Sequence, residues 1–297
     1  MSCRLPERIA ATFLLASLAL PALAQHPETL SWCDTLAQRL RSVEAESCRK
    51  LGLEPGNMRS VQGRPLMIRD VPAAPLKLSA LKTNTGKPVQ QRPARIFVIG
   101  GIHGDELTSV SIVFRWMDWL GEAEARQYHW RIAPLSNPDG LLARPSRRTN
   151  GNGVDLNRNF PTPDWFADAL PYWKQRTKED PRRFPGTKPM SEPETRWLHQ
   201  EIERFKPDVI VSIHAPYGIL DYDGPAQEPR RFGRLNLNRL GVYPGSLGNF
   251  GGVHKNIPVI TIELPNATAM PAPKEQRQIW DDMLAWIKKH IVPQTLS

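Results

Sequence analysis

The stretch from Ile96 to Glu106 constrains the fold of this chain more than any other. Four apolar residues and a glycine pair, in Ile-Phe-Val-Ile-Gly-Gly, predict a buried parallel strand that ends in a tight turn. His103 and Glu106 follow, three positions apart at the start of a predicted helix, so both side chains face the crevice beyond the strand. They supply two of the three ligands of a two-histidine, one-carboxylate zinc site, although a solvated pair without metal would have the same sequence.

Predicted strands and helices alternate along most of the chain. This alternation predicts an α/β fold with a mixed, mostly parallel, doubly wound sheet that carries helices on both faces. The section 136–190 is predicted to be irregular, and so long a loop is either functional or disordered. The predicted strands are 96–99, 128–135, 208–213 and 258–264, with short edge strands at 65–70 and 76–81 before a polar link at 82–92. The predicted helices are 106–121, 191–205 (opened by a capping box, Ser191-Glu-Pro-Glu194) and 274–290.

The first 24 residues have the form of a secretory signal peptide. Arg4 and Arg8 precede an apolar run from Ile9 to Leu20, and an Ala-x-Ala sequence ends at Ala24. The run of 12 residues is shorter than the roughly 20 that span a bilayer, which disfavours a membrane anchor. We therefore expect an exported protein, located in the bacterial periplasm, with no stable membrane insertion after cleavage of residues 1–24.

Two cysteines, Cys33 and Cys48, remain in the segment 25–61, which is predicted to be a helical N-terminal extension. An oxidising compartment favours a disulfide between them. One straight helix would hold residues 15 apart at about 22 Å, whereas a disulfide tolerates only about 7 Å between α-carbons. A disulfide therefore requires two short helices that fold back on each other, and two buried unpaired thiols are the alternative. Residues 62–297 form the predicted catalytic domain.

The chain is basic, with a net charge of +9 over 297 residues. A basic surface favours nucleic acid, anionic membrane faces or acidic polymers. Nucleic acid does not suit an exported protein, and the aromatic residues are not interleaved with basic ones as base stacking would require. The charge therefore indicates a generally solvated basic surface, with attraction to acidic cell-wall material as a secondary interpretation.

Two more side chains with catalytic chemistry lie at predicted strand ends. His214 follows the apolar run Val209–Ile213, and the carboxyl ends of parallel strands converge on one crevice, so His214 can meet His103 and Glu106. Glu263 is flanked by apolar residues, where a carboxylate is costly unless it is paired or functional. Beside a zinc-activated water, Glu263 would act as general base. The simpler interpretation of Glu263 is a structural ion pair. The simpler interpretation of His214 is a strand-end histidine that forms a hydrogen bond with a nearby carbonyl.

Two pairs of polar residues lie in the loop region that faces this crevice. Asn157 and Arg158 are adjacent, and an amide beside a planar guanidinium suits a substrate carboxylate. Arg147 and Arg148 lie earlier and can supply the positive charge that stabilises an oxyanion. A basic loop that simply faces water is the alternative for the second pair.

In their order along residues 60 to 290, these motifs resemble those of the zinc metallocarboxypeptidases. The resemblance is carried by His103-Gly-Asp-Glu106, Asn137-Pro-Asp-Gly140, the stretch 153–160, Ser212-Ile-His214 and Thr261-Ile-Glu-Leu264. Three stretches are similar to one branch, the murein peptide amidase A type: the Gly-Asp pair inside the metal motif, the segment 186–194 and Tyr243-Pro-Gly-Ser246. That branch hydrolyses the bond between γ-D-glutamate and meso-diaminopimelate in cell-wall peptides.

The resemblance implies a zinc carboxypeptidase-like fold and a site with one zinc ion. His103, Glu106 and His214 would bind the zinc, and Glu263 would be the catalytic base. Asp155 would orient a ligand imidazole, as such sites generally need.

The same resemblance implies roles for the polar pairs. Asn157 and Arg158 would hold the terminal carboxylate of the substrate. Arg148, from its Arg-x-Asn spacing to Asn150, would polarise the scissile carbonyl as a catalytic group, with Arg147 as the alternative.

Two positions depart from the family pattern. Many members have an arginine where Asp105 stands, and we interpret Asp105 as a substrate-binding group that meets the free amine of diaminopimelate. Tyr243 lies near the segment of the family's mobile active-site tyrosine, but its spacing to Ser246 does not match, so its role is left open.

The sequence thus predicts an exported zinc peptidase that acts on murein peptides. A zinc amidohydrolase of the aspartoacylase or succinylglutamate desuccinylase kind uses the same ligand set, but Asn137-Pro-Asp-Gly140 and the signal peptide disfavour it. The sequence is also compatible with a carboxypeptidase that trims L-residues from proteins and with a non-catalytic wall-binding protein. The presence of all three ligands and of the base favours catalysis.

Overall fold

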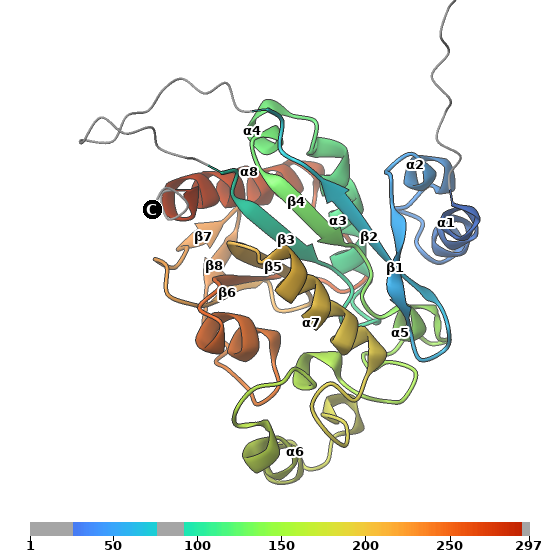
Figure 1. The fold of residues 1–297 in the computed structure, drawn as a ribbon, viewed down its shortest axis with the longest axis vertical. Coiled ribbons are helices and arrows are strands. Elements are labelled where there is room, and N and C mark those ends of the chain that lie inside the picture. The colour runs from blue at the N-terminus through green and yellow to red at the C-terminus, as the bar shows by residue number, and fades with distance from the viewer. Residues whose placement is uncertain (1–25, 76–91, 293–297) are drawn as a thin grey trace, which may run out of the picture.

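A computed structural model describes residues 26–75 and 92–292 (Figure 1). The predicted signal peptide, the predicted strand at 76–81 and all but the last residue of the polar link at 82–92 lie outside these described residues. Among the helices of the described ranges, none has both the length and the apolar composition needed to cross a bilayer.

The described residues form a mixed sheet whose centre is parallel. Its four central strands, β4, β3, β5 and β9, run in one direction, whereas β1, β2 and β6 join through antiparallel pairing. The predicted mixed α/β sheet is therefore confirmed. In sheet order the strands are β1 (Glu54–Arg59), β2 (Pro65–Val71), β4 (His129–Ala133), β3 (Arg95–Ile99), β5 (Val209–His214), β9 (Val259–Glu263), β6 (Ile219–Asp223), β8 (Leu235–Leu237) and β7 (Arg231–Phe232).

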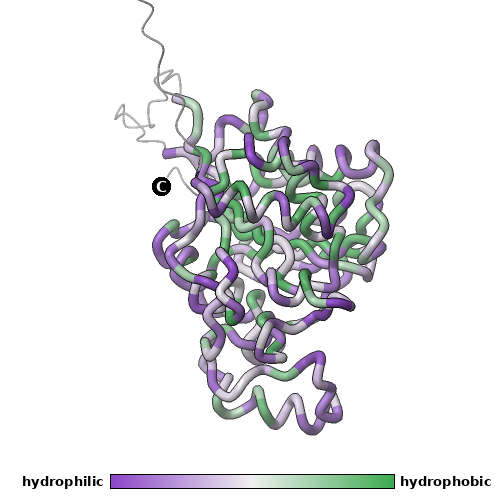
Figure 2. Tube along the Cα trace, turned by 90° about the vertical axis from the view of Figure 1, so that its right-hand side faces the viewer, coloured by the Kyte–Doolittle hydropathy of each residue, from purple (hydrophilic) through white to green (hydrophobic). Residues whose placement is uncertain are grey.

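Helices cover both faces of this sheet, as Figure 1 shows. One face packs against α3 (Leu107–Trp119) and α8 (Pro273–His290), where the rings of Trp116 and Trp130 each lie 5.3 Å from that of Trp280. The other face packs against α7 (Pro193–Phe205). Figure 2 shows hydrophobic stretches mainly inside the broad part of the molecule and hydrophilic ones along its outer turns. The shorter helices are α4 (Ala123–Arg126), α5 (Pro138–Leu142), η1 (Leu156–Arg158), η2 (Trp165–Ala169), α6 (Leu170–Arg176), η3 (Pro181–Arg183) and η4 (Gly248–His254).

The described part of the predicted extension, residues 26–61, is only partly helical, which corrects the prediction of a helical segment at 25–61. Two helices, α1 (Pro27–Arg39) and α2 (Ala45–Arg49), fold back on each other, and a disulfide joins Cys33 to Cys48 with 5.7 Å between their α-carbons. The remainder forms β1, which pairs with β2, so β2 is not an edge strand. The sequence of β1, Glu-Pro-Gly-Asn-Met-Arg, has no strand pattern, and an edge position is where a sheet tolerates proline.

The start of α7 also differs from its prediction. The helix begins at Pro193, and its N-cap residue, Glu192, makes no side-chain capping bond, so the predicted capping box of Ser191 and Glu194 is wrong. The buried Glu194 carboxylate instead accepts hydrogen bonds from the Val61 backbone N–H at 3.0 Å and from the Asn150 side chain at 3.0 Å. The acidic residue thus serves a long-range contact instead of a local cap.

Stability is expected to fall as the pH rises through neutrality, because burial, opposed by the Asn150 bond, raises the pKa of Glu194 to about 7. Because the pKa is raised, the protonated Glu194 carboxyl contributes fully to the free energy of unfolding below the ordinary pKa of 4.5. This contribution, roughly 3 kcal/mol, is lost as the pH rises through about 7. In Glu194→Gln this loss is absent. Urea unfolding of both proteins at pH 4.5 and pH 8 measures it, and an equal change in the two proteins would contradict the assignment.

Candidate metal centre and its surrounding cavity

Three polar side chains converge at the carboxyl ends of the neighbouring strands β3 and β5. His214 is the last residue of β5, His103 follows β3, and Glu106 is the N-cap residue of α3. The turn between them depends on glycine: Gly101 has φ +57°, and a Cβ at Gly104 would lie 2.2 Å from the Gly140 backbone. Parallel pairing of β3 with β5 therefore brings His214 to the turn that carries His103 and Glu106.

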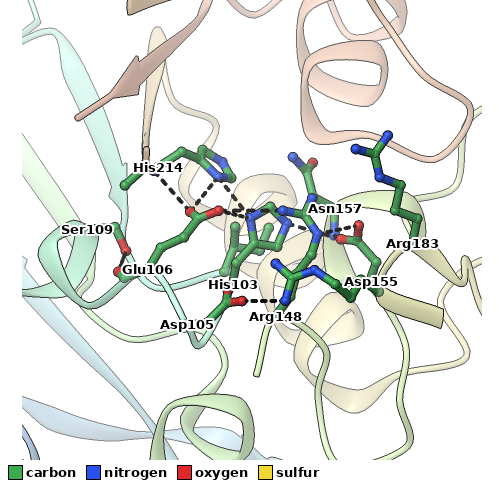
Figure 3. Close-up of polar contacts among 12 residues, drawn as sticks. His103, Asp105, Glu106, Ser109, Arg148, Asp155, Asn157, Arg183 and His214 are labelled. Carbon is green, nitrogen blue, oxygen red and sulfur yellow. Dashed lines mark hydrogen bonds and ion pairs between the residues drawn. The ribbon is translucent and has the colours of Figure 1, made fainter. Parts of the chain in front are cut away.

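The three side chains point toward one another (Figure 3). His103 Nδ1 lies 2.8 Å from Glu106 Oε1, His214 Nδ1 lies 3.1 Å from Glu106 Oε2, and the two Nδ1 atoms are 3.2 Å apart. Ligands held tetrahedrally at zinc distances are about 3.3 Å apart. All three residues are buried, and their donor atoms lie within 4.8 Å of one another. Donor chemistry and spacing both fit one zinc ion.

The remaining ring nitrogen of each histidine is also held. His103 Nε2 lies 3.1 Å from Asp155 Oδ1, and His214 Nε2 lies 3.0 Å from Ser212 Oγ, so both rings present Nδ1 to the same point. Although burial opposes it, the positive charge of Arg148 and His103 holds the pKa of Asp155 well below its usual range. Sequence reasoning missed the role of Ser212, for which the signal was its place two residues before His214 on the same face of a strand.

Glu263 lies beside this cluster, at the end of β9. The register of β5 and β9 pairs His214 directly with Glu263. The glutamate is 5% exposed and lines the cavity, and within the described residues its Oε2 has no hydrogen-bond partner. Burial, partly offset by His214, raises the pKa of Glu263. A buried carboxylate oxygen without a partner, next to a metal-ligand cluster, is available to a substrate or a water molecule.

The structure separates the two candidate arginines. Arg148 lines the cavity, donates from Nε to Asp155 Oδ2 at 3.0 Å, and places Nη1 3.5 Å from Glu106 Oε1. Arg147 is not among the residues that line the cavity, and it donates to the Gly151 carbonyl at 3.4 Å. The structure therefore does not bring Arg147 to the site, because adjacent side chains of this loop point to different sides.

Asn157 and Arg158 lie on η1, and both line the same cavity as Glu263. Asn157 Oδ1 accepts from the Leu247 backbone N–H at 2.8 Å, which leaves its amide nitrogen toward the cavity. The Arg158 guanidinium stacks 4.4 Å from the centre of the Tyr243 ring, and Tyr243 also lines the cavity. Tyr243 thus touches the predicted carboxylate-binding arginine directly, as a cation–π partner.

Asp105 has a partner that the sequence did not reveal. Its Oδ2 forms an ion pair with Arg182 Nη1 at 2.8 Å, and both residues line the cavity. Arg182 and Arg183 come from η3, inside the long section predicted to be irregular. The cavity has a volume of about 340 Å³, and its wall includes both carboxylates of β6, Asp221 and Asp223.

Comparison with known proteins identifies this arrangement. The zinc carboxypeptidase family model matches residues 57–228, which include His103, Glu106 and His214. This chain belongs to the zinc carboxypeptidase family. Murein peptide amidase A of Escherichia coli (strain K12) is 31% identical over 208 residues, covering 66% of this chain and 81% of that protein. Murein peptide amidase A of Vibrio campbellii is 30% identical over 201 residues, covering 63% and 79%.

Solved structures share the fold of this zinc carboxypeptidase. The crystal structure of the murein-tripeptide amidase MpaA from Escherichia coli O157 matches with a TM-score of 0.52 and 27% identity, covering 79% of this chain and 92% of that one. Bovine thrombin-activatable fibrinolysis inhibitor matches with a TM-score of 0.57, covering 90% and 95%, and its 18% identity shows the fold alone. The predicted family, fold class and zinc metallopeptidase activity are therefore confirmed.

Proposed function

We propose that this protein is an exported zinc peptidase that hydrolyses murein peptides at the bond between γ-D-glutamate and meso-diaminopimelate. The observation that carries the proposal is the single cavity lined by the histidine–glutamate cluster, Glu263 and Arg158, in which Glu263 Oε2 has no hydrogen-bond partner among residues 26–75 and 92–292. The murein peptide amidases among its relatives, which are about 30% identical, support the substrate class.

In this proposal His103, Glu106 and His214 hold one zinc ion. When bound, the ion would act as a Lewis acid that polarises the scissile carbonyl and lowers the pKa of a water molecule. Glu263 would take a proton from the water as its oxygen bonds to the scissile carbonyl carbon, and would pass that proton to the amine nitrogen as the C–N bond breaks. Arg148, fixed by Asp155, stabilises the charge that develops on the carbonyl oxygen of the substrate.

The substrate is held by other groups that line the cavity. Asn157 and Arg158 bind the terminal carboxylate, and Tyr243 keeps the Arg158 guanidinium plane in place by stacking on it. The free amine of diaminopimelate meets Asp105, which then shares its charge between that amine and Arg182. Both ends of a diamino acid thus find a partner of opposite charge.

Replacing Arg158 with lysine is expected to raise KM by about 10- to 100-fold with little change in kcat, because the ammonium cannot form a two-pronged contact to a carboxylate. Steady-state kinetics on a murein tripeptide measure the effect. The matched control is the same peptide with its terminal carboxyl amidated, on which the two proteins should perform alike. An equal loss on both peptides would show that Arg158 does not bind the carboxylate.

The function is tested by mass spectrometry of a muropeptide digest made with the zinc-loaded protein. The proposal expects release of diaminopimelate from the γ-D-glutamyl residue, and it expects no turnover of N-acetylated or N-succinylated amino acids. Cleavage of a different bond, or turnover of the acylated amino acids alone, would overturn it. Mass analysis of the mature protein tests export, with the chain expected to begin at Gln25.

A further inference from the structure

The turn between Arg148 and Asp155 is closed by the backbone and the side chain of Asn150. The Asn150 backbone N–H donates to the Val154 carbonyl at 3.0 Å, and its side-chain oxygen accepts from the Val154 N–H at 3.1 Å. Asp155 directly follows Val154, and Arg148 lies two residues before Asn150. The position of Asn150 therefore sets the positions of both groups.

Two buried carboxylates hold the Asn150 amide from the start of α7. Asn150 Nδ2 donates to Glu192 Oε2 at 2.7 Å and to Glu194 Oε2 at 3.0 Å. The two glutamates are 3% and 0% exposed. In the part of the chain that the structure describes, no Lys, Arg or His forms an ion pair with either carboxylate. Burying two acidic groups without a countercharge is costly, so their contacts to Asn150 call for a functional explanation.

The other end of the loop is held by the same segment. Asn159 donates from Nδ2 to Ser191 Oγ at 3.0 Å, and its side-chain oxygen accepts from the Glu192 backbone N–H at 3.2 Å. Residues 191–194 therefore fix both ends of the loop 150–159. One end borders Arg148 and Asp155, and the other end borders Arg158.

We propose that Glu192 and Glu194 are positioning residues that act through Asn150 to fix Arg148 and Asp155 at the metal centre. Arg148 donates to Asp155, and Asp155 in turn holds the ring of His103. Glu192, Glu194 and Asn150 together form what we call the Glu192–Glu194–Asn150 clamp. The clamp therefore affects the reacting carbonyl through the position of Arg148. It affects the metal through the position of the His103 ring. The effect on turnover rests on the role proposed above for Arg148, whereas the effect on the His103 ring does not.

The test is Asn150→Asp measured at pH 8, above the pKa of about 7 of Glu194, where the substitution keeps the shape of the side chain but faces two carboxylates with a third. We expect kcat to fall by about 100-fold and zinc affinity by about 10- to 100-fold. KM should change less than about 2-fold, because Asn159 still anchors the Arg158 end. Zinc affinity is measured by competition with a chromophoric chelator, and thermal melting reports folding. Asn236→Asp, the same change at an exposed site in β8, is the matched control.

Rescue distinguishes positioning from a general loss of structure. Glu192 Oε2 also accepts from Asn152 Nδ2 at 2.8 Å, so a glutamine there keeps its oxygen toward Asn152, whereas Glu194→Gln can turn its amide toward position 150. Combining Asn150→Asp with Glu192→Gln and Glu194→Gln therefore removes both facing charges and supplies one amide donor to the new carboxylate, and it should restore kcat and zinc affinity to within about 3-fold. A folded Asn150→Asp protein with unchanged kcat and zinc affinity, or a folded triple variant without recovery, would overturn the proposal. If Asn150→Asp does not fold, kcat, KM and zinc affinity are measured on Glu192→Ala instead, which removes one acceptor of the Asn150 amide. The same outcomes then support or overturn the proposal. If the wild type cleaves no murein peptide, the proposed function fails while zinc affinity still decides the clamp.

Discussion

Replacing Glu263 with glutamine is expected to lower kcat by about 10²- to 10⁴-fold while the zinc content stays at that of the wild type. Glutamine keeps the size and the hydrogen-bonding atoms of the side chain but cannot accept a proton at neutral pH. Glu263 is not one of the three converging donors, and its Oε2 has no partner among the described residues, so the substitution leaves the metal ligands in place. Steady-state kinetics and metal analysis of the same protein sample test both parts.

The control for this variant is Glu46→Gln, which makes the same chemical change at an exposed position of α2. It should retain wild-type kcat and KM. A Glu263→Gln enzyme with more than about one tenth of the wild-type kcat would show that another group moves the proton. Loss of zinc from that variant would instead place Glu263 among the ligands.

Replacing His214 with alanine is expected to remove both zinc and activity. A site with three protein ligands loses a strong nitrogen donor, and the remaining His103–Glu106 pair offers only two of the three protein ligands that a catalytic zinc site uses. Dialysis against a chelator should have the same effect on the wild type, and added zinc should restore the wild type but not the variant.

His254→Ala is the matched control for the second variant, because His254 is exposed at the end of η4. It should bind one zinc ion per chain and turn over substrate at the wild-type rate. A His214→Ala protein that keeps stoichiometric zinc and measurable turnover would contradict the ligand assignment.

The sequence predicted for a physical reason that three potential metal ligands would converge. His103, Glu106 and His214 each lie at or just beyond the end of an apolar strand, and parallel strands bring their carboxyl ends to one edge. Once the strands are recognised, the topology of the sheet places the residues together without any knowledge of side-chain packing. Glu263 follows the same rule through β9.

The parts that sequence reasoning missed depend on which side chains meet across long distances. Ser191 and Glu194 have capping-box spacing, yet a tertiary partner, Asn150, takes the carboxylate that a local cap would have used. Arg182 reaches Asp105 from a segment without a periodic pattern. Local spacing cannot rank a nearby backbone partner against a distant side chain, because that choice is made by the packing of the whole domain.

Strand β1 shows the same limit in the backbone. Its six residues include proline and glycine and have no alternation of apolar and polar side chains. They form a strand because the exposed edge of β2 offers unpaired hydrogen-bonding groups. Edge pairing of this kind leaves little trace in the paired segment itself.

The central claim is that His103, Glu106 and His214 bind one zinc ion in the cavity that also holds Glu263 and Arg158. X-ray diffraction from crystals of the zinc-loaded protein, recorded on both sides of the zinc absorption edge, tests it most directly. We expect one anomalous peak within about 2.3 Å of a nitrogen of each histidine and of a Glu106 oxygen. Zinc-loaded crystals with no peak among these three side chains, or with zinc bound elsewhere on the chain, would contradict the account.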